Sequence, residues 1–225
     1  MTGRARMDIF DVVGPVMIGP SSSHTAGAAR IGRITRKILG EKVVAADIGF
    51  HGSFAKTWRG HGADRAILGG LMGLDVDDER LRNSRNIADA AGMKYSFRNV
   101  YLSDTHPNTL LLRVTGESGK ALKLQAASIG GGRIEVQYID DLEAGFAGDK
   151  PTLIVPHYDV PGVIAFVAGC LSEANINIAR MGVFRQEAGG AAVMIIETDG
   201  LPEETVVEKL KLMPSVLNVT LLESL

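Results

Sequence analysis

The run Gly14-Pro15-Val16-Met17-Ile18-Gly19-Pro20-Ser21-Ser22-Ser23-His24-Thr25 stands close to the start of the chain. Two Gly-Pro pairs interrupt regular backbone within it, and three hydroxyls and an imidazole follow them. Directly after the run, Ile31, Ile34 and Ile38 recur at helical spacing. The pattern predicts a polar loop that leads into a helix, and Gly40 is expected to end that helix.

A polar loop at this position is suited to binding an anion. The first turn of a helix has unpaired N–H groups and carries the positive end of the helix dipole. The simplest alternative is that one of Ser21, Ser22 and Ser23 only caps a core helix. A single cap leaves two serines, His24 and Thr25 unexplained, so we treat these five residues as a candidate site.

Two other interpretations of the loop are disfavoured by the residue types. Gly14 and Gly19 have the spacing of a P-loop, but Pro20 and Ser21 occupy the positions of its lysine and its magnesium-binding hydroxyl. A serine hydrolase is improbable as well, since neighbouring residues in one loop rarely place a hydroxyl against an imidazole with a third group behind it. The chain also has no Gly-x-Ser-x-Gly motif.

Length and composition narrow the class of protein. A chain of 225 residues with 45% hydrophobic content can bury a sizeable core, and we expect two domains. A net charge of −2 provides no basic field for nucleic acid. Neither a signal-peptide pattern nor an apolar run of membrane-spanning length occurs, which predicts a cytoplasmic protein. The single cysteine, Cys170, excludes both an internal disulfide and an iron–sulfur cluster held by cysteines of this chain alone.

Two more polar loops are predicted further along. A strand over 43–50 is followed by an expected glycine-rich loop over 51–62, in which His61 stands between two glycines. A lone histidine in a loop is most often a surface residue. In the loop over 104–109, Pro107 is expected to keep His106 extended, with Asn108 beside it.

A glycine-rich stretch, Ser128 to Gly132, is predicted after a hairpin over 110–127. Three glycines at the end of a strand can form a bulge or a wide turn, and they also allow backbone N–H groups to converge on an oxyanion. Both interpretations stay open. Other elements expected in this region are a helical turn over 9–13, a helix over 25–39, a helix capped by Asp64, and strands over 93–101 and 133–139.

The acidic segment over 141–150 has no apolar period and is predicted to be a linker between domains at 1–140 and 151–225. After it, the pattern predicts a strand, a helix, two strands, a helix and a strand. This βαββαβ order is that of a ferredoxin-like sandwich.

The chain carries a family resemblance on these motifs. Residues 19–25 resemble the signature of the β subunit, or β domain, of iron–sulfur-dependent L-serine dehydratases. The segments 50–57, 60–62, 106–109 and 128–132 fall in that family's order, so the resemblance covers almost the whole chain. One departure is Ala63, which stands where family members commonly have a threonine near His61.

The resemblance implies a fold and a partner. The first domain resembles the allosteric substrate-binding domain of some phosphoglycerate dehydrogenases, with a mixed sheet, and the second resembles the ACT domain, giving an α/β (α+β) protein. By resemblance, a separate α subunit carries a [4Fe–4S] cluster, and the two chains together convert L-serine into pyruvate and ammonia. The chain alone is not expected to be active, and no metal site is expected within it. A homodimer through the ACT domain is also implied.

Site residues follow from the same resemblance. The chemistry needs a base for the Cα proton and a Lewis acid for the β-hydroxyl, and this sequence has histidines but no metal-ligand spacing. His61 and His24 are the implied catalytic residues. The implied substrate-binding residues are Ser21, Ser22, Ser23, Thr25, His106, Asn108 and Gly131.

The ACT-like part suggests a second site, for an effector. His157, Asp159 and Gly162 join the first strand of that domain to its first helix, where Pro161 and Gly162 give access to backbone N–H groups. Asp159 is placed to face a ligand's ammonium group. The alternative is a fold kept only for dimerisation. A rival for the whole chain is a non-catalytic regulatory protein that binds an amino acid.

Overall fold

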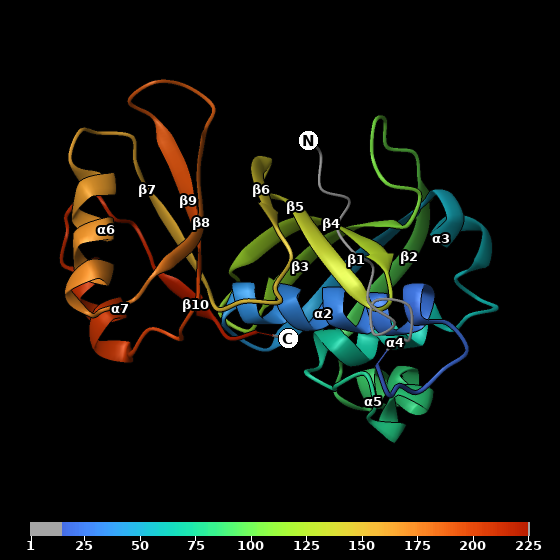
Figure 1. The fold of residues 1–225 in the computed structure, drawn as a ribbon. Coiled ribbons are helices and arrows are strands. Elements are labelled where there is room, and N and C mark those ends of the chain that lie inside the picture. Colours follow the sequence, from blue (N-terminus) through green and yellow to red (C-terminus); the bar gives the residue numbers. More distant parts are fainter. Residues whose placement is uncertain (1–14, 225) are drawn as a thin grey trace, which may run out of the picture. The chain divides into compact units, whose positions relative to one another are not determined.

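The computed structural model describes residues 15–224, so the turn predicted over 9–13 and Gly14 lie outside the described residues. The chain divides into two compact units (Figure 1). The first comprises residues 1–121 and 126–134, and the second comprises residues 122–125 and 135–225. No described helix has the length and apolar character needed to cross a membrane.

A six-stranded mixed sheet has the order β2-β1-β3-β4-β5-β6. Strand β1 pairs in parallel with β2, where Ala45 lies opposite Lys94, and antiparallel with β3, where Ile48 lies opposite Leu112. The strands are β1 Val43–His51, β2 Lys94–Val100, β3 Thr109–Gly116, β4 Ala121–Gly130, β5 Arg133–Ile139 and β6 Leu142–Phe146. The mixed sheet confirms the predicted fold class of this part of the chain.

Helix α2 (Gly27–Leu39) confirms the helix predicted from the isoleucine spacing. Ile31 and Ile34 are fully buried, and Gly40 ends the helix in the left-handed conformation with φ 81°. Beside α2 lies α4 (Ala63–Leu71; Figure 1). The two helices cross at backbone contact, since a Cβ atom added to Gly70 would lie 2.0 Å from the Ala29 carbonyl oxygen.

The loop predicted over 51–62 is partly wrong, because Gly52–Thr57 forms helix α3. Aromatic packing accounts for the difference. Phe54 is fully buried, and the Trp58 ring stacks on Phe50 with centroids 5.0 Å apart. The Thr57 hydroxyl also donates to the Ser53 carbonyl at 2.8 Å within the helix. Burial of these rings therefore gives helical structure to a stretch that looks like a loop in sequence.

Asp64 was predicted to cap α4, and this is wrong. The N-cap is Gly62, in the left-handed conformation and without a side-chain bond, while Asp64 pairs with Arg85 at 2.6 Å. The charged stretch that follows forms η2 (Glu79–Asn83) and α5 (Ser84–Ala90).

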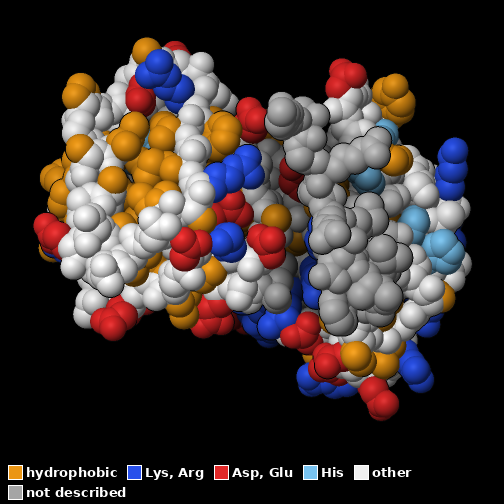
Figure 2. All heavy atoms as spheres, viewed as in Figure 1, with side chains coloured by type: hydrophobic (Ala, Val, Ile, Leu, Met, Phe, Trp, Pro, Cys, Tyr) orange, Lys and Arg blue, Asp and Glu red, His pale blue; other side chains and the backbone are white. Residues whose placement is uncertain are grey.

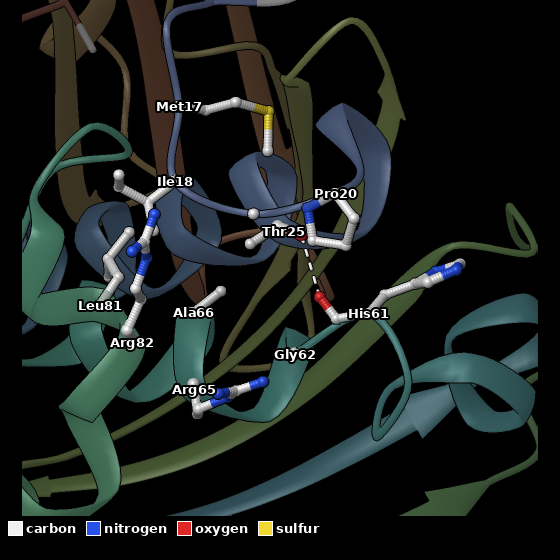
Figure 3. Close-up of a pocket in the computed structure, with 11 residues that line it drawn as sticks. Met17, Ile18, Pro20, Thr25, His61, Gly62, Arg65, Ala66, Leu81 and Arg82 are labelled. Carbon is white, nitrogen blue, oxygen red and sulfur yellow. Dashed lines mark hydrogen bonds between the residues drawn. The ribbon is translucent and has the colours of Figure 1, made fainter.

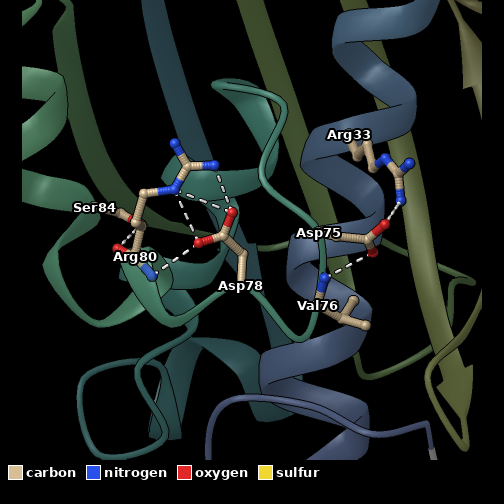
Figure 4. Close-up of polar contacts among 6 residues, drawn as sticks. All are labelled: Arg33, Asp75, Val76, Asp78, Arg80 and Ser84. Atoms are coloured by element: carbon tan, nitrogen blue, oxygen red, sulfur yellow. Dashed lines mark hydrogen bonds and ion pairs between the residues drawn. The ribbon is translucent and has the colours of Figure 1, made fainter.

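Ion pairs fix the connection between α4 and α5 (Figure 4). Arg33 of α2 pairs with Asp75, and the Asp75 carboxylate also accepts from the Val76 N–H at 2.8 Å. Asp78 caps η2 by accepting from the Arg80 N–H at 2.9 Å, and its carboxylate pairs with the Arg80 guanidinium. The connection is thereby held against α2.

The second unit contains the predicted βαββαβ order, and its sheet has the order β10-β7-β9-β8 with antiparallel pairs. Its core includes Val155, Leu171, Met194 and Ile196, with Cys170 among them. The elements are β7 Thr152–Tyr158, α6 Val163–Glu173, β8 Ile178–Arg185, β9 Ala191–Thr198, α7 Glu204–Lys211 and β10 Thr220–Leu222.

The segment predicted as a linker, 141–150, is only partly irregular. Leu142–Phe146 forms β6, which pairs antiparallel with β5, with Tyr138 opposite Glu143. Ala144 and Phe146 are buried and alternate with more exposed neighbours, as in a strand. This pattern is too short to be recognised in a sequence segment rich in glycine and acidic residues.

Candidate functional site

The serine-rich segment forms one turn of π-helix, η1 (Ser22–Ala26), directly before α2. Ser21 is its N-cap, and the Ser21 hydroxyl accepts from the His24 N–H at 3.1 Å. A cap is therefore part of the explanation for these serines. Single π-turns occur frequently at functional sites. Here the turn buries His24, whose exposed fraction is 9%.

Three hydroxyls surround the His24 imidazole. Its Nδ1 lies 3.0 Å from Ser23 Oγ and 3.3 Å from Ser21 Oγ, and its Nε2 lies 3.2 Å from Ser53 Oγ. Burial, and then the nearby His61, lower the His24 pKa. The ring is thus held in place and favoured in its neutral form.

Ser53 was not among the predicted site residues. It lies on α3, 29 residues from His24, and the helix directs its hydroxyl at the imidazole. The available signal was its place in the segment 50–57, which carries the family resemblance.

His61 lies beside His24. The two rings meet edge to face with centroids 4.8 Å apart, and the Thr25 hydroxyl donates to the His61 carbonyl at 3.0 Å. The His61 Nδ1 atom is buried and has no hydrogen-bond partner among the described residues. The structure therefore brings together three predicted site residues, Thr25, His24 and His61.

The loop over 104–109 joins this group through its backbone. The Pro107 carbonyl accepts from the Ser53 N–H at 2.7 Å, and the Asn108 carbonyl accepts from the Ser128 N–H at 2.9 Å. His106 Nδ1 accepts from the Asn108 N–H at 3.1 Å. The predicted loops around His24, His106 and Ser128 are thus connected through hydrogen bonds.

Buried polar atoms without partners occur mainly in the predicted motifs. In the described part of the chain, four buried side-chain atoms have none, and three of them, His61 Nδ1, Asn108 Oδ1 and Ser128 Oγ, belong to the predicted motifs. The fourth is Asp64 Oδ1. Because an unpaired buried polar group is costly, such a concentration is typical of a binding site rather than of a structural core.

The turn at Gly130, Gly131 and Gly132 has left-handed φ angles of 102°, 60° and 78°. Ser128 to Gly130 extend β4, so the turn is shorter than predicted. Arg30 of α2 donates to the Gly132 carbonyl at 2.9 Å, which fixes the turn against the helix. Oxyanion binding by its N–H groups stays a prediction.

The hydrolase interpretation gains no support from this geometry. Both ring nitrogens of His24 face serine hydroxyls, and no described carboxylate bonds to either nitrogen. A Ser-His-acid triad needs an acid behind the imidazole.

A cavity of about 590 Å³ lies next to the imidazole pair (Figure 3). Figure 3 shows the His61 ring pointing away from this cavity, while the His61 backbone lines it and accepts from Thr25. The lining residues are Met17, Ile18, Gly19, Pro20, Thr25, His61, Gly62, Arg65, Ala66, Leu81 and Arg82.

The three predicted effector residues of the second unit have different surroundings. His157 is buried, with its Nδ1 2.9 Å from the Val155 carbonyl oxygen. Asp159 pairs with Arg185 and accepts from the Gly189 N–H at 3.1 Å, and these contacts lower its pKa. Gly162 is the N-cap of α6 and has open space beside it, and effector binding by these three residues stays a prediction.

The described residues contain no group of three or more His, Cys, Asp or Glu side chains that could hold a metal ion. Cys170 is buried in the core of the second unit, where burial raises its pKa. The side chains that the structure describes therefore do not fit as ligands of an iron–sulfur cluster.

Two family models match the chain. Residues 6–96 match the model described as "Serine dehydratase beta chain", and residues 152–211 match the model described as "ACT domain". The second match agrees with the βαββαβ order of the second unit.

Similar proteins cover most of the chain. It is 43% identical over 212 residues to "Probable L-serine dehydratase, beta chain" of Bacillus subtilis (strain 168), covering 94% of this chain and 96% of that protein. It is 34% identical to "L-serine dehydratase, beta chain" of Peptoniphilus asaccharolyticus, covering 84% and 86%. It is also 28% identical to "D-3-phosphoglycerate dehydrogenase" of Methanocaldococcus jannaschii, covering 91% of this chain but 38% of that protein.

Proposed function

The chain belongs to the serine dehydratase β-chain family, and on this premise we propose that it works with an α chain to convert L-serine into pyruvate and ammonia. In this proposal the α chain carries a [4Fe–4S] cluster. The reaction removes the Cα proton and the β-hydroxyl of serine as water, which leaves 2-aminoacrylate. Water then replaces the nitrogen, and ammonia and pyruvate result.

The observation that carries the proposal is the pairing of His24 with His61. A dehydratase needs groups that accept and return protons near neutral pH, and imidazole is the side chain whose ordinary pKa suits this task. His61 Nδ1 is buried and makes no hydrogen bond to a described residue, so no structural partner occupies it. His24 is held neutral beside it by burial and by three hydroxyl contacts.

Two other orphaned atoms of the predicted motifs suit serine. The Asn108 Oδ1 atom accepts a hydrogen bond and so suits the substrate's ammonium or hydroxyl group, and Ser128 Oγ both accepts and donates. In the proposed enzyme these atoms orient the substrate, and the α chain closes the site against water. The departure at Ala63 removes a possible hydroxyl near His61, although His61 itself is kept in place by Thr25.

The direct test is reconstitution. The chain is mixed under anaerobic conditions with an α chain carrying its cluster, and pyruvate formed from L-serine is measured. We expect turnover only when both chains are present. Pyruvate formation by this chain alone, or undiminished turnover by the α chain without it, would contradict the proposal.

A second candidate function is amino-acid binding without catalysis. The similarity to D-3-phosphoglycerate dehydrogenase, which extends over 91% of this chain, is compatible with it, because that similarity is not confined to dehydratases. The open N-terminus of α6 at Gly162 is the place for an amino acid in that case. Calorimetric titration of the chain with L-serine measures such binding, and a Gly162→Val variant tests its location.

We also propose that the second unit pairs with another copy of itself. Strand β8 is at the edge of its sheet, and hydrophobic side chains gather over the strands of this unit in Figure 2. Light scattering of the purified chain tests this proposal, which predicts twice the monomer mass. A monomer at all concentrations would contradict it.

A further inference from the structure

The cavity beside the imidazole pair has a charge pattern that the proposed reaction does not use. Its walls are mostly apolar, with Met17, Ile18 and Leu81 among them, and two arginines, Arg65 and Arg82, complete them (Figure 3). Arg65 extends from α4 and Arg82 from η2. Among the described residues, no aspartate or glutamate lines the cavity.

Neither arginine is neutralised by another described residue. Within residues 15–224, other exposed arginines such as Arg80, Arg85 and Arg98 pair with aspartates, but no such pair involves Arg65 or Arg82. Two guanidinium groups at one cavity without an acid favour an anion there, and the planar guanidinium suits a carboxylate.

The cavity is formed by anchored segments. The Ile18 N–H donates to the Val76 carbonyl at 2.8 Å, which fixes one wall. Gly19 packs on Thr25, where a Cβ atom would lie 2.5 Å from the threonine methyl group, and Thr25 is bonded to the His61 carbonyl. Because these segments are already ordered, binding a ligand in the cavity costs little conformational entropy.

We propose that this cavity binds a small carboxylate with an apolar tail and without an ammonium group. The arginines meet the carboxylate, and the apolar walls cover the tail. An amino acid is disfavoured because none of the described lining side chains can neutralise its ammonium group, which would lie near two positive charges. The volume of about 590 Å³ is within the range for small-molecule sites. The site is separate from the imidazole pair and does not depend on the proposed reaction.

A set of ligands of matched shape tests the charge requirement. The full-length chain is titrated calorimetrically with 4-methylpentanoate, with L-leucine, which adds an ammonium group to the same skeleton, and with 4-methylpentanamide, which has no charge. We expect 4-methylpentanoate to bind at least about tenfold more tightly than either of the others. Acetate has the charge but almost no apolar tail, and we expect it to bind as weakly as L-leucine and 4-methylpentanamide. Equal binding of L-leucine or of acetate would overturn the assigned ligand class.

Variants locate the site. Arg65→Gln and Arg82→Gln are each expected to weaken binding of 4-methylpentanoate about tenfold, with Lys at either position restoring part of it. The matched control is Arg113→Gln, which removes the same charge from an exposed arginine that contacts Asp47. We expect this variant to bind 4-methylpentanoate as tightly as the unmodified chain does. Both cavity arginines are exposed, so the variants should fold, and thermal unfolding checks this. Unchanged affinity in both cavity variants, or an equal loss in Arg113→Gln, would overturn the proposal.

Discussion

The imidazole rings of His24 and His61 meet edge to face, with their centroids 4.8 Å apart and their planes at 75°. Their hydrogen-bonding environments differ. His24 faces serine hydroxyls at both nitrogens, whereas His61 Nδ1 is buried without a described partner. Burial and the nearby His61 lower the pKa of His24, which favours its neutral form. His61 Nδ1 is therefore a ring nitrogen of the pair that no described residue engages.

Stability of the first unit should depend on pH through His24. Its pKa is lowered below 6.5 in the folded state, so the unfolded chain binds a proton more readily. The resulting stability is present above pH 6.5 and is lost as the pH falls through the lower, folded-state pKa. Urea unfolding followed by fluorescence of Trp58, the single tryptophan, measures this between mildly acidic and neutral pH. His24→Gln should flatten the dependence, and an unchanged slope would contradict the assignment.

Removal of the Ser53 hydroxyl should impair the position of His24 without unfolding the protein. Ser53→Ala breaks the contact with His24 Nε2, at a cost of about 1 kcal/mol. We expect turnover of the reconstituted enzyme to fall about tenfold and the NMR signals of the His24 ring to shift. Ser53→Thr keeps a hydroxyl and serves as the matched variant. Equal effects of the two substitutions would mean that the hydroxyl itself does not position the ring.

Local patterns predicted much of this fold, because the forces involved act over a few residues. The isoleucine spacing and Gly40 define α2, and Gly162 begins α6. The second unit repeats this agreement over its whole βαββαβ order.

Side-chain packing and tertiary contacts explain what the patterns missed. Helix α3 depends on packing of Phe54 and Trp58 around Phe50 of the preceding strand. Ser53 becomes a partner of His24 only when α3 is formed beside η1. Motif order indicated which loops belong to the candidate site, whereas the identity of the contacting atoms depends on tertiary packing.

The crossing of α2 and α4 should not accept a methyl group. Alanine is usually favoured over glycine in a helix by about 0.8 kcal/mol, but at Gly70 its Cβ would lie 2.0 Å from the Ala29 carbonyl oxygen. We expect Gly70→Ala to destabilise the first unit by about 2 kcal/mol or more, as measured by urea unfolding. Gly169→Ala is the control, since Gly169 lies in α6 with no atom near its added Cβ, and it should be neutral or stabilising. Similar effects at both glycines would contradict the close crossing.

Cys170 should react slowly with thiol reagents in the folded chain. The thiol is 5% exposed in the core of the second unit, and burial raises its pKa, so little thiolate is present at neutral pH. Because it is the only cysteine, its labelling rate reports opening of this unit directly. Labelling with a disulfide reagent across a urea gradient should become fast only where the unit unfolds. Rapid labelling in the absence of denaturant would show that the core is open there.

Ser128→Ala should separate stability from function. The Ser128 hydroxyl is fully buried without a described partner, so its removal relieves an unpaired polar group and should leave the first unit as stable as before, or up to about 1 kcal/mol more stable. If the hydroxyl is reserved for the substrate, the same change lowers turnover of the reconstituted enzyme and raises its KM for L-serine. Thr35→Ala is a useful comparison, because the buried Thr35 hydroxyl donates to the Ile31 carbonyl and its loss should cost stability. A stable Ser128→Ala enzyme with unaltered kinetics would show that the Ser128 hydroxyl neither stabilises the fold nor contacts the substrate. Ser128 would then not belong to the site.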